Sequence, residues 1–116
     1  MFRFEELEIW RLAIDYAKDC YRVAASFPGH EVYGLSDQLR RAAVSISNNI
    51  AEGSVGSDTS FRRYLTLAIG SALETVNILH FAHEIRYIEE QQRRELYDKA
   101  EMLIRKVRSF SKTIRD

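Results

Sequence analysis

Residues 38–53 have the sequence Gln-Leu-Arg-Arg-Ala-Ala-Val-Ser-Ile-Ser-Asn-Asn-Ile-Ala-Glu-Gly, and the spacing within this stretch predicts a helix. Continued toward the N-terminus, the pattern has intervals of four and three residues at Leu35, Leu39, Ala42, Ile46, Asn49 and Gly53. This is the heptad spacing of a helix that packs against other helices. We therefore predict a helix over about residues 31–52, with Asn49 on its core-facing seam and a flexible Gly/Ser-rich connection at 53–57.

Two further helices are predicted on either side of this stretch. The first covers about residues 4–26, with its seam at Leu7, Trp10, Ile14, Ala17, Tyr21 and Ala24. Phe27-Pro28-Gly29 ends it, because proline disfavours the helical conformation at the residue before it. The other opens at 57–59, where Ser57 or Asp58 can cap the first turn. Its seam comprises Phe61, Leu65, Ala68, Ala72, Val76, Leu79 and Ala82.

The last predicted helix carries a regular seam over residues 96–114. The seam residues are Leu96, Ala100, Leu103, Val107, Phe110 and Ile114. No glycine or proline marks where this helix begins, so the turn before it is placed only within residues 86–90.

Four such helices predict an all-α fold, an antiparallel up-down-up-down four-helix bundle that forms a single domain over residues 1–116. Hydrophobic residues make up 46% of the chain and charged residues 29%, which excludes a disordered protein. The seams are rich in alanine, which allows close helix approach but buries little area per residue. Apolar surface is therefore left over, and assembly into a homo-oligomer would bury it.

The chain is expected to be cytoplasmic and to have no membrane span. Its first residues include acids where a signal peptide needs basic residues and an apolar stretch. Residues 64–83 have the length of a span and a single charge, Glu74, but too many polar side chains for one.

The sequence contains no catalytic or metal-binding pattern that predicts an enzyme. His80 and His83 share a helical face and could hold a metal, but no further ligand has a clear spacing, and a hydrogen-bonded pair is the alternative. Cys20 has no local feature that would activate its thiol. Gly53 and Gly56 lack the lysine and the spacing of a phosphate-binding loop. We expect no catalysis, no metal and no cofactor.

A polar stripe lies along the helix at 31–52. It comprises Arg41, Ser45, Asn48, Asn49 and Glu52 on one side of an otherwise apolar helix. Buried polar groups are costly unless they are hydrogen-bonded, so the stripe indicates an internal network or contact with a partner. The alternative is a structural role, in which polar residues at core positions fix the register of the helices and the oligomeric state.

Several motifs together resemble a known bacterial family. They are Phe4-Glu-x-Leu7-x-x-Trp10, Phe27-Pro28-x-x-Glu31-x-Tyr33-Gly34-Leu35, Arg41-Ala-Ala-x-Ser45-Ile46-x-x-Asn49-Ile-Ala-Glu52-Gly53 and Tyr64-Leu65-x-x-Ala68-x-Gly70-Ser71-x-x-Glu74. Across nearly the whole chain the sequence resembles the four-helix-bundle proteins encoded in intervening sequences of 23S ribosomal RNA genes, which are often labelled ribosomal-protein-like. That family is similar in turn to the accessory variability protein of diversity-generating retroelements.

The resemblance implies a ring-like homo-oligomer, with a pentamer as the expected size, and a basic surface that engages nucleic acid. The family usually has Gly-Tyr before the last helix and a capping Ser or Asp after it. This chain has Arg86-Tyr87 and Glu89 at those places, so its last turn departs from the pattern.

Charge is unevenly distributed along this chain of zero formal net charge. Residues 1–60 hold six basic and nine acidic residues, and residues 61–116 hold eleven and eight. The basic residues of the last helix are Arg105, Lys106, Arg108, Lys112 and Arg115, and Arg62 and Arg63 are added as candidates from the third helix. Such a face can bind the phosphate backbone. The alternative is a solvated face whose cations complement the helix C-terminal dipole.

Two functions follow as hypotheses. The first is an oligomeric accessory protein that binds RNA or DNA through its basic face. The second is a protein-protein interaction scaffold with no nucleic-acid ligand, which the zero net charge and the polar stripe favour.

Overall fold

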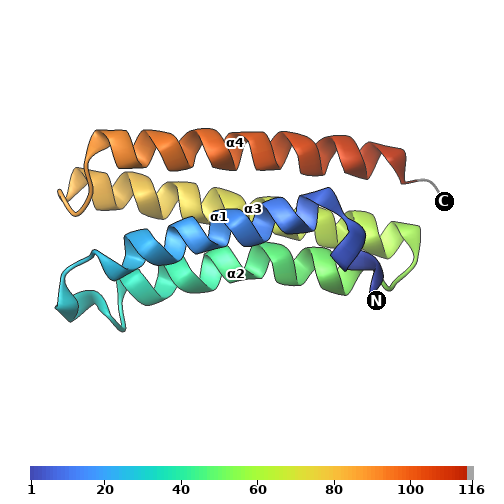
Figure 1. Ribbon diagram of the computed structural model, residues 1–116, viewed down its shortest axis with the longest axis horizontal. Coiled ribbons are helices and arrows are strands. Elements are labelled where there is room, and N and C mark those ends of the chain that lie inside the picture. The colour runs from blue at the N-terminus through green and yellow to red at the C-terminus, as the bar shows by residue number, and fades with distance from the viewer. Residues whose placement is uncertain (115–116) are drawn as a thin grey trace.

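Four antiparallel helices form the bundle in the computed structural model, which describes residues 1–114 (Figure 1). They are α1 (Glu8–Ala25), α2 (Leu35–Gly53), α3 (Asp58–Glu84) and α4 (Glu90–Thr113). α1 and α3 each pack against both α2 and α4. The N-terminus, the α2–α3 turn and the end of α4 lie at one end of the bundle (Figure 1). The predicted all-α up-down-up-down fold is confirmed.

Two helices begin later than the sequence predicts. Residues Arg3–Glu6 form a 3-10 turn, and Leu7 is extended, so α1 begins at Glu8. Before α2, residues Gly29–Glu31 form a second 3-10 turn, and a carboxylate oxygen of Glu31 accepts a hydrogen bond from the Leu35 N–H at 3.1 Å. Glutamate is a good helix former, and here its side chain instead satisfies an open donor of the first turn.

The start of α3 is as predicted. The Ser57 hydroxyl accepts a hydrogen bond from the Ser60 N–H at 3.2 Å and so caps the helix. Glycine at position 53 has a packing role next to this turn. A Cβ there would lie 2.6 Å from the Tyr64 Cβ and 2.9 Å from the Phe61 Cδ1, so only glycine lets α2 and α3 approach this closely.

The turn between α3 and α4 is a Schellman motif that contains an arginine. Arg86 has φ of 67°, the left-handed conformation in which glycine is usual. The Tyr87 N–H donates to the Ala82 carbonyl at 2.8 Å, and the Arg86 N–H donates to the His83 carbonyl at 3.0 Å. These bonds satisfy carbonyl groups that the helix end leaves open. The turn therefore keeps its geometry without the expected glycine.

The predicted seams of α3 and α4 form much of the core. Every alanine expected on a seam is buried, and the large buried side chains include Phe61, Leu65, Leu79, Leu103 and Val107. A polar contact also lies in the core, where the Tyr16 and Thr75 hydroxyl oxygens are 2.7 Å apart. Thr75 in turn donates to the Ala72 carbonyl at 2.6 Å. The core thus satisfies its polar groups locally.

The predicted seam of α1 is confirmed at Ala17 and Ala24 and is wrong at its other positions. The buried face of α1 comprises Ile9, Ala13, Tyr16, Ala17, Cys20 and Ala24. Leu7, Trp10 and Ile14 are only half-buried, and Tyr21 is 46% exposed. α1 carries two adjacent apolar stripes, and the one with the smaller residues faces the core because it allows closer packing.

α3 is long and apolar enough to pass a length and hydropathy test for a membrane span. Its buried residues pack into the core of the bundle along the whole helix. A core helix of a soluble protein passes the same test.

Candidate nucleic-acid interface

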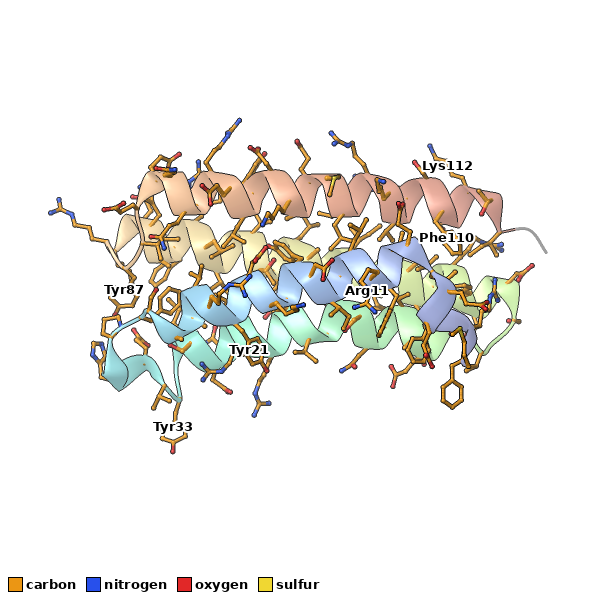
Figure 2. All side chains as sticks on the ribbon, viewed as in Figure 1. Arg11, Tyr21, Tyr33, Tyr87, Phe110 and Lys112 are labelled. Atoms are coloured by element: carbon orange, nitrogen blue, oxygen red, sulfur yellow. The ribbon has the colours of Figure 1, made fainter. Side chains whose placement is uncertain are left out.

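Three cations form a continuous basic face on the outer side of α4. Arg105, Arg108 and Lys112 are exposed and follow each other at intervals of three and four residues. Arg105 lies 3.9 Å from Glu101 with both side chains mostly exposed, so this pair is weak. Within residues 1–114, Arg108 and Lys112 form no ion pair. In Figure 2 the Lys112 side chain projects outward from α4. We call these three residues the α4 basic face.

Lys106, Arg62 and Arg63, also predicted as basic candidates, lie elsewhere at the same end of the bundle. Lys106 is on the flank of α4 that faces α1, and its Nζ is 3.1 Å from a Glu8 carboxylate oxygen. Arg62 donates to the Ile114 carbonyl at 3.1 Å and so helps to hold the end of α4. Arg63 is exposed in the first turns of α3. Arg115, also predicted for this face, lies outside the described residues.

Two hollows in the groove between α3 and α4 border the α4 basic face. One, of about 280 Å³, is lined by Leu73, Val76, Tyr97, Glu101, Ile104, Arg105 and Arg108. The other, of about 350 Å³, is lined by Leu65, Thr66, Ile69, Arg108, Ser111 and Lys112. Arg108 lies at both. The groove therefore combines an apolar floor with a cationic rim.

The polar stripe of α2 makes a local network at the surface. The Ser45 and Ser71 hydroxyl oxygens are 2.8 Å apart and join α2 to α3. The Asn49 amide donates to the Ser45 carbonyl at 2.8 Å and reaches the Ser45 hydroxyl at 3.1 Å. The placement of Asn49 on a core seam is wrong, because the side chain is only half-buried and the core line passes through Ile46 and Ile50 instead.

The stripe also lines a hollow over α1 and α2. This hollow, of about 520 Å³, is lined by Tyr21, Asp37, Arg40, Arg41, Val44, Ser45, Asn48, Asn49 and Glu52. Arg41 pairs with Asp37 at 2.9 Å, and Glu52 is exposed and forms no ion pair within residues 1–114. The predicted α1 seam placed Tyr21 in the core, and this prediction is wrong because the side chain lies at the surface. The charged residues beside it, Lys18 and Arg22, were the available signal.

The titratable groups elsewhere are held in structural contacts. Burial raises the pKa of the Cys20 thiol to about 12, so the thiol stays protonated and unreactive. At the α3–α4 turn, hydrogen bonds from Arg93 lower the pKa of Glu90 to about 2. Arg93 also contacts His80 at 3.3 Å, and His83 lies 3.4 Å from Glu90. The two histidines thus belong to a charged cluster that ties α3 to α4.

No group of three or more His, Cys, Asp or Glu side chains within residues 1–114 is placed to hold a metal ion. The exposed cations beside an apolar groove are suited to contact a polyanion, whose phosphates accept hydrogen bonds from guanidinium and ammonium groups.

Comparisons with known proteins agree with the fold. The model of the family described as 23S rRNA-intervening sequence protein matches residues 5–109. A solved structure, described as a protein of unknown function from the S23 ribosomal protein family of Bacteroides thetaiotaomicron, superposes with a TM-score of 0.79. It is 21% identical and covers 90% of this chain and 98% of its own. A search of curated proteins gave no significant match.

Proposed function

Because this chain belongs to the 23S rRNA-intervening sequence protein family, we propose that it is a non-enzymatic, homo-oligomeric protein of the cytoplasm. In this proposal it binds the phosphate backbone of RNA or DNA through the α4 basic face. The observation that supports this proposal most strongly is the exposure of Arg105, Arg108 and Lys112 on one side of α4.

The spacing of the three cations suits a nucleic-acid strand. Seven residues of helix separate Arg105 from Lys112, which is about 10 Å along the helix axis. A strand of duplex DNA rises by about 3.4 Å per phosphate, so this length spans about three phosphates. Contacts to phosphates do not distinguish one base from another, and we therefore expect binding without sequence preference.

The helix dipole does not account for the whole face. A cation near a helix C-terminus is stabilised by the dipole, but the effect falls off within the last turn. α4 ends at Thr113, so Lys112 lies in the last turn, whereas Arg105 and Arg108 lie further back. The two arginines are therefore available for an external anion.

Exposed apolar side chains on α3 support assembly. Leu73 is 51% exposed and Phe81 is 54% exposed, and Leu67 adds a further apolar side chain to the surface of the same helix. Contact between copies would remove this surface from water. A closed ring, with a pentamer as the size expected from the family resemblance, would repeat the α4 basic face and multiply its contacts with one polymer.

An electrophoretic mobility shift tests the proposal. The probes are a short DNA duplex and a structured ribosomal RNA fragment at about 50 mM salt, where phosphate contacts are strong. The wild type should shift both, and the combined Arg105→Gln, Arg108→Gln and Lys112→Gln variant should shift both only at much higher protein concentration while its circular dichroism stays helical. Arg94→Gln is the matched control, because Arg94 is an exposed arginine of the same helix outside the face.

Failure of the wild type to shift either probe would refute the proposal, as would an undiminished shift with the triple variant. In that case the α3–α4 groove, with its apolar floor, would favour the second candidate, a scaffold for a protein partner. Recovery of a defined protein from nuclease-treated lysate, lost on Leu73→Arg, would support that candidate.

A further inference from the structure

Tyr21 stands in the wall between two hollows on the face formed by α1 and α2. The ring is 46% exposed and borders both the 520 Å³ hollow described above and a second of about 420 Å³. In Figure 2 Tyr21 lies over α1 and α2, away from Lys112 at the outer edge of α4. This face is therefore distinct from the α4 basic face.

The two hollows differ in chemistry. The second is lined by Ile14, Ala17 and Val44, with Lys18 and Arg22 at its rim. The first is polar and offers two amides, Asn48 and Asn49, together with two carboxylates and two guanidinium groups. Tyr21 thus borders one apolar hollow and one polar hollow whose side chains can pair with the edges of bases.

Two of the cations around Tyr21, Lys18 and Arg41, are held in exposed ion pairs, whereas Arg22 lies 2.5 Å from a carboxylate oxygen of Asp19. Lys18 lies 3.7 Å from Asp15, and both side chains are more than half exposed. The Arg41 side chain is 81% exposed although it pairs with Asp37. Exposed pairs within one helix contribute little, so a phosphate can replace the carboxylate partner.

We propose that this face binds single-stranded nucleic acid, with one base stacked on the Tyr21 ring and the flanking phosphates on Lys18, Arg22, Arg40 and Arg41. The choice of polymer rests on the proposed function, but the site is separate. An aromatic ring within a basic surface is the arrangement by which proteins hold single strands without reading sequence. A duplex is excluded because its bases are already stacked on each other.

The charge around Tyr21 favours this occupant over a second copy of the chain. The core of an interface between proteins is depleted in charged residues. Here four cations line the two hollows, against the two carboxylates of Asp37 and Glu52. The excess of positive charge complements a polyanion.

Fluorescence anisotropy with the full chain tests the site. The probes are a labelled single strand of about 12 nucleotides, within the range that such surfaces cover, the same strand with abasic positions, and a duplex of equal length. Tyr21→Ala should weaken binding of the single strand by about tenfold, because one stacked base is lost. Binding of the abasic strand and of the duplex should not change with this substitution.

Two variants isolate the ring itself. Tyr21→Phe keeps the stacking surface and should restore most of the single-strand affinity. Tyr33→Ala is the matched control, because Tyr33 is a 93% exposed tyrosine that lines neither hollow. It should bind all three probes as the wild type does.

The outcomes separate this site from the proposed function. Wild-type binding to none of the probes refutes both. Binding to all probes with no loss in Tyr21→Ala refutes the Tyr21 site alone, and so does an equal loss on the duplex. Light scattering completes the test, because a change of oligomeric mass in Tyr21→Ala would identify the face as a contact between copies and overturn the inference.

Discussion

Substituting Arg86 with glycine should stabilise the protein. Arg86 occupies the left-handed conformation at φ of 67°, which costs a residue with a Cβ about 1–2 kcal/mol. Glycine removes that cost, but it also has more conformational freedom in the unfolded chain. This extra entropy of the unfolded state offsets about 0.5–1 kcal/mol of the gain in stability. The free energy of unfolding should therefore rise by about 0.5–1 kcal/mol. For a chain of 116 residues the unfolding entropy makes 1 kcal/mol worth about 4 °C, so Tm should rise by about 2–4 °C.

The assay is thermal and chemical denaturation followed by circular dichroism at a fixed protein concentration, because self-association would otherwise shift Tm. Arg86→Ala is the matched control, since it removes the same exposed side chain and keeps the Cβ. It should bring no gain. A Tm for Arg86→Gly that equals that of Arg86→Ala, or that falls below the wild type, would refute the argument that backbone strain is stored at this turn.

Three other changes test the packing and the charges. Gly53→Ala should lower the free energy of unfolding by about 1–3 kcal/mol through overpacking. Gly70→Ala should raise it by up to about 1 kcal/mol, because nothing lies within 4 Å of the added Cβ. Equal effects of the two substitutions would contradict the close approach of α2 and α3. Thr75→Val should cost about 1–3 kcal/mol because the buried Tyr16 hydroxyl loses its acceptor, and adding Tyr16→Phe should recover part of the loss in urea titrations. The pKa of Glu90 is lowered from 4.5 to about 2 in the folded state, so its stabilising contribution is present above about pH 4.5 and is lost as the pH falls toward 2. Glu90→Gln should flatten Tm in that window, and an unchanged pH profile would count against the Arg93 contact.

The seams of α3 and α4 could be predicted because large apolar residues repeat at heptad spacing on each helix, although α3 carries a second apolar stripe that includes the buried Ile78 and the exposed Leu73. Leu96, Leu103 and Val107 leave no competing register for α4. In α1 two apolar stripes lie side by side, and only the three-dimensional packing decides between them. Tyr21 was assigned to the core for this reason, since a tyrosine suits a half-exposed position as well as a buried one.

One long-range pair and two local backbone features account for the rest of what the sequence could not specify. The basic spacing on α4 was visible in the sequence, but the pairing of Lys106 with Glu8 joins residues from opposite ends of the chain. The turn at Arg86 carries no glycine or proline, so only the glycine that the resembled family has at that place pointed to a left-handed residue. Glu31 caps α2 through its side chain, a role that helix propensity does not reveal.

The salt dependence of duplex binding tests the central claim most directly. If Arg105, Arg108 and Lys112 contact three phosphates, the slope of log K against log salt should be shallower by about 2.7 in the variant that replaces all three by glutamine. Arg94→Gln should leave the slope unchanged. Equal slopes for the wild type and the triple variant would show that the α4 basic face makes no phosphate contacts and would contradict the account.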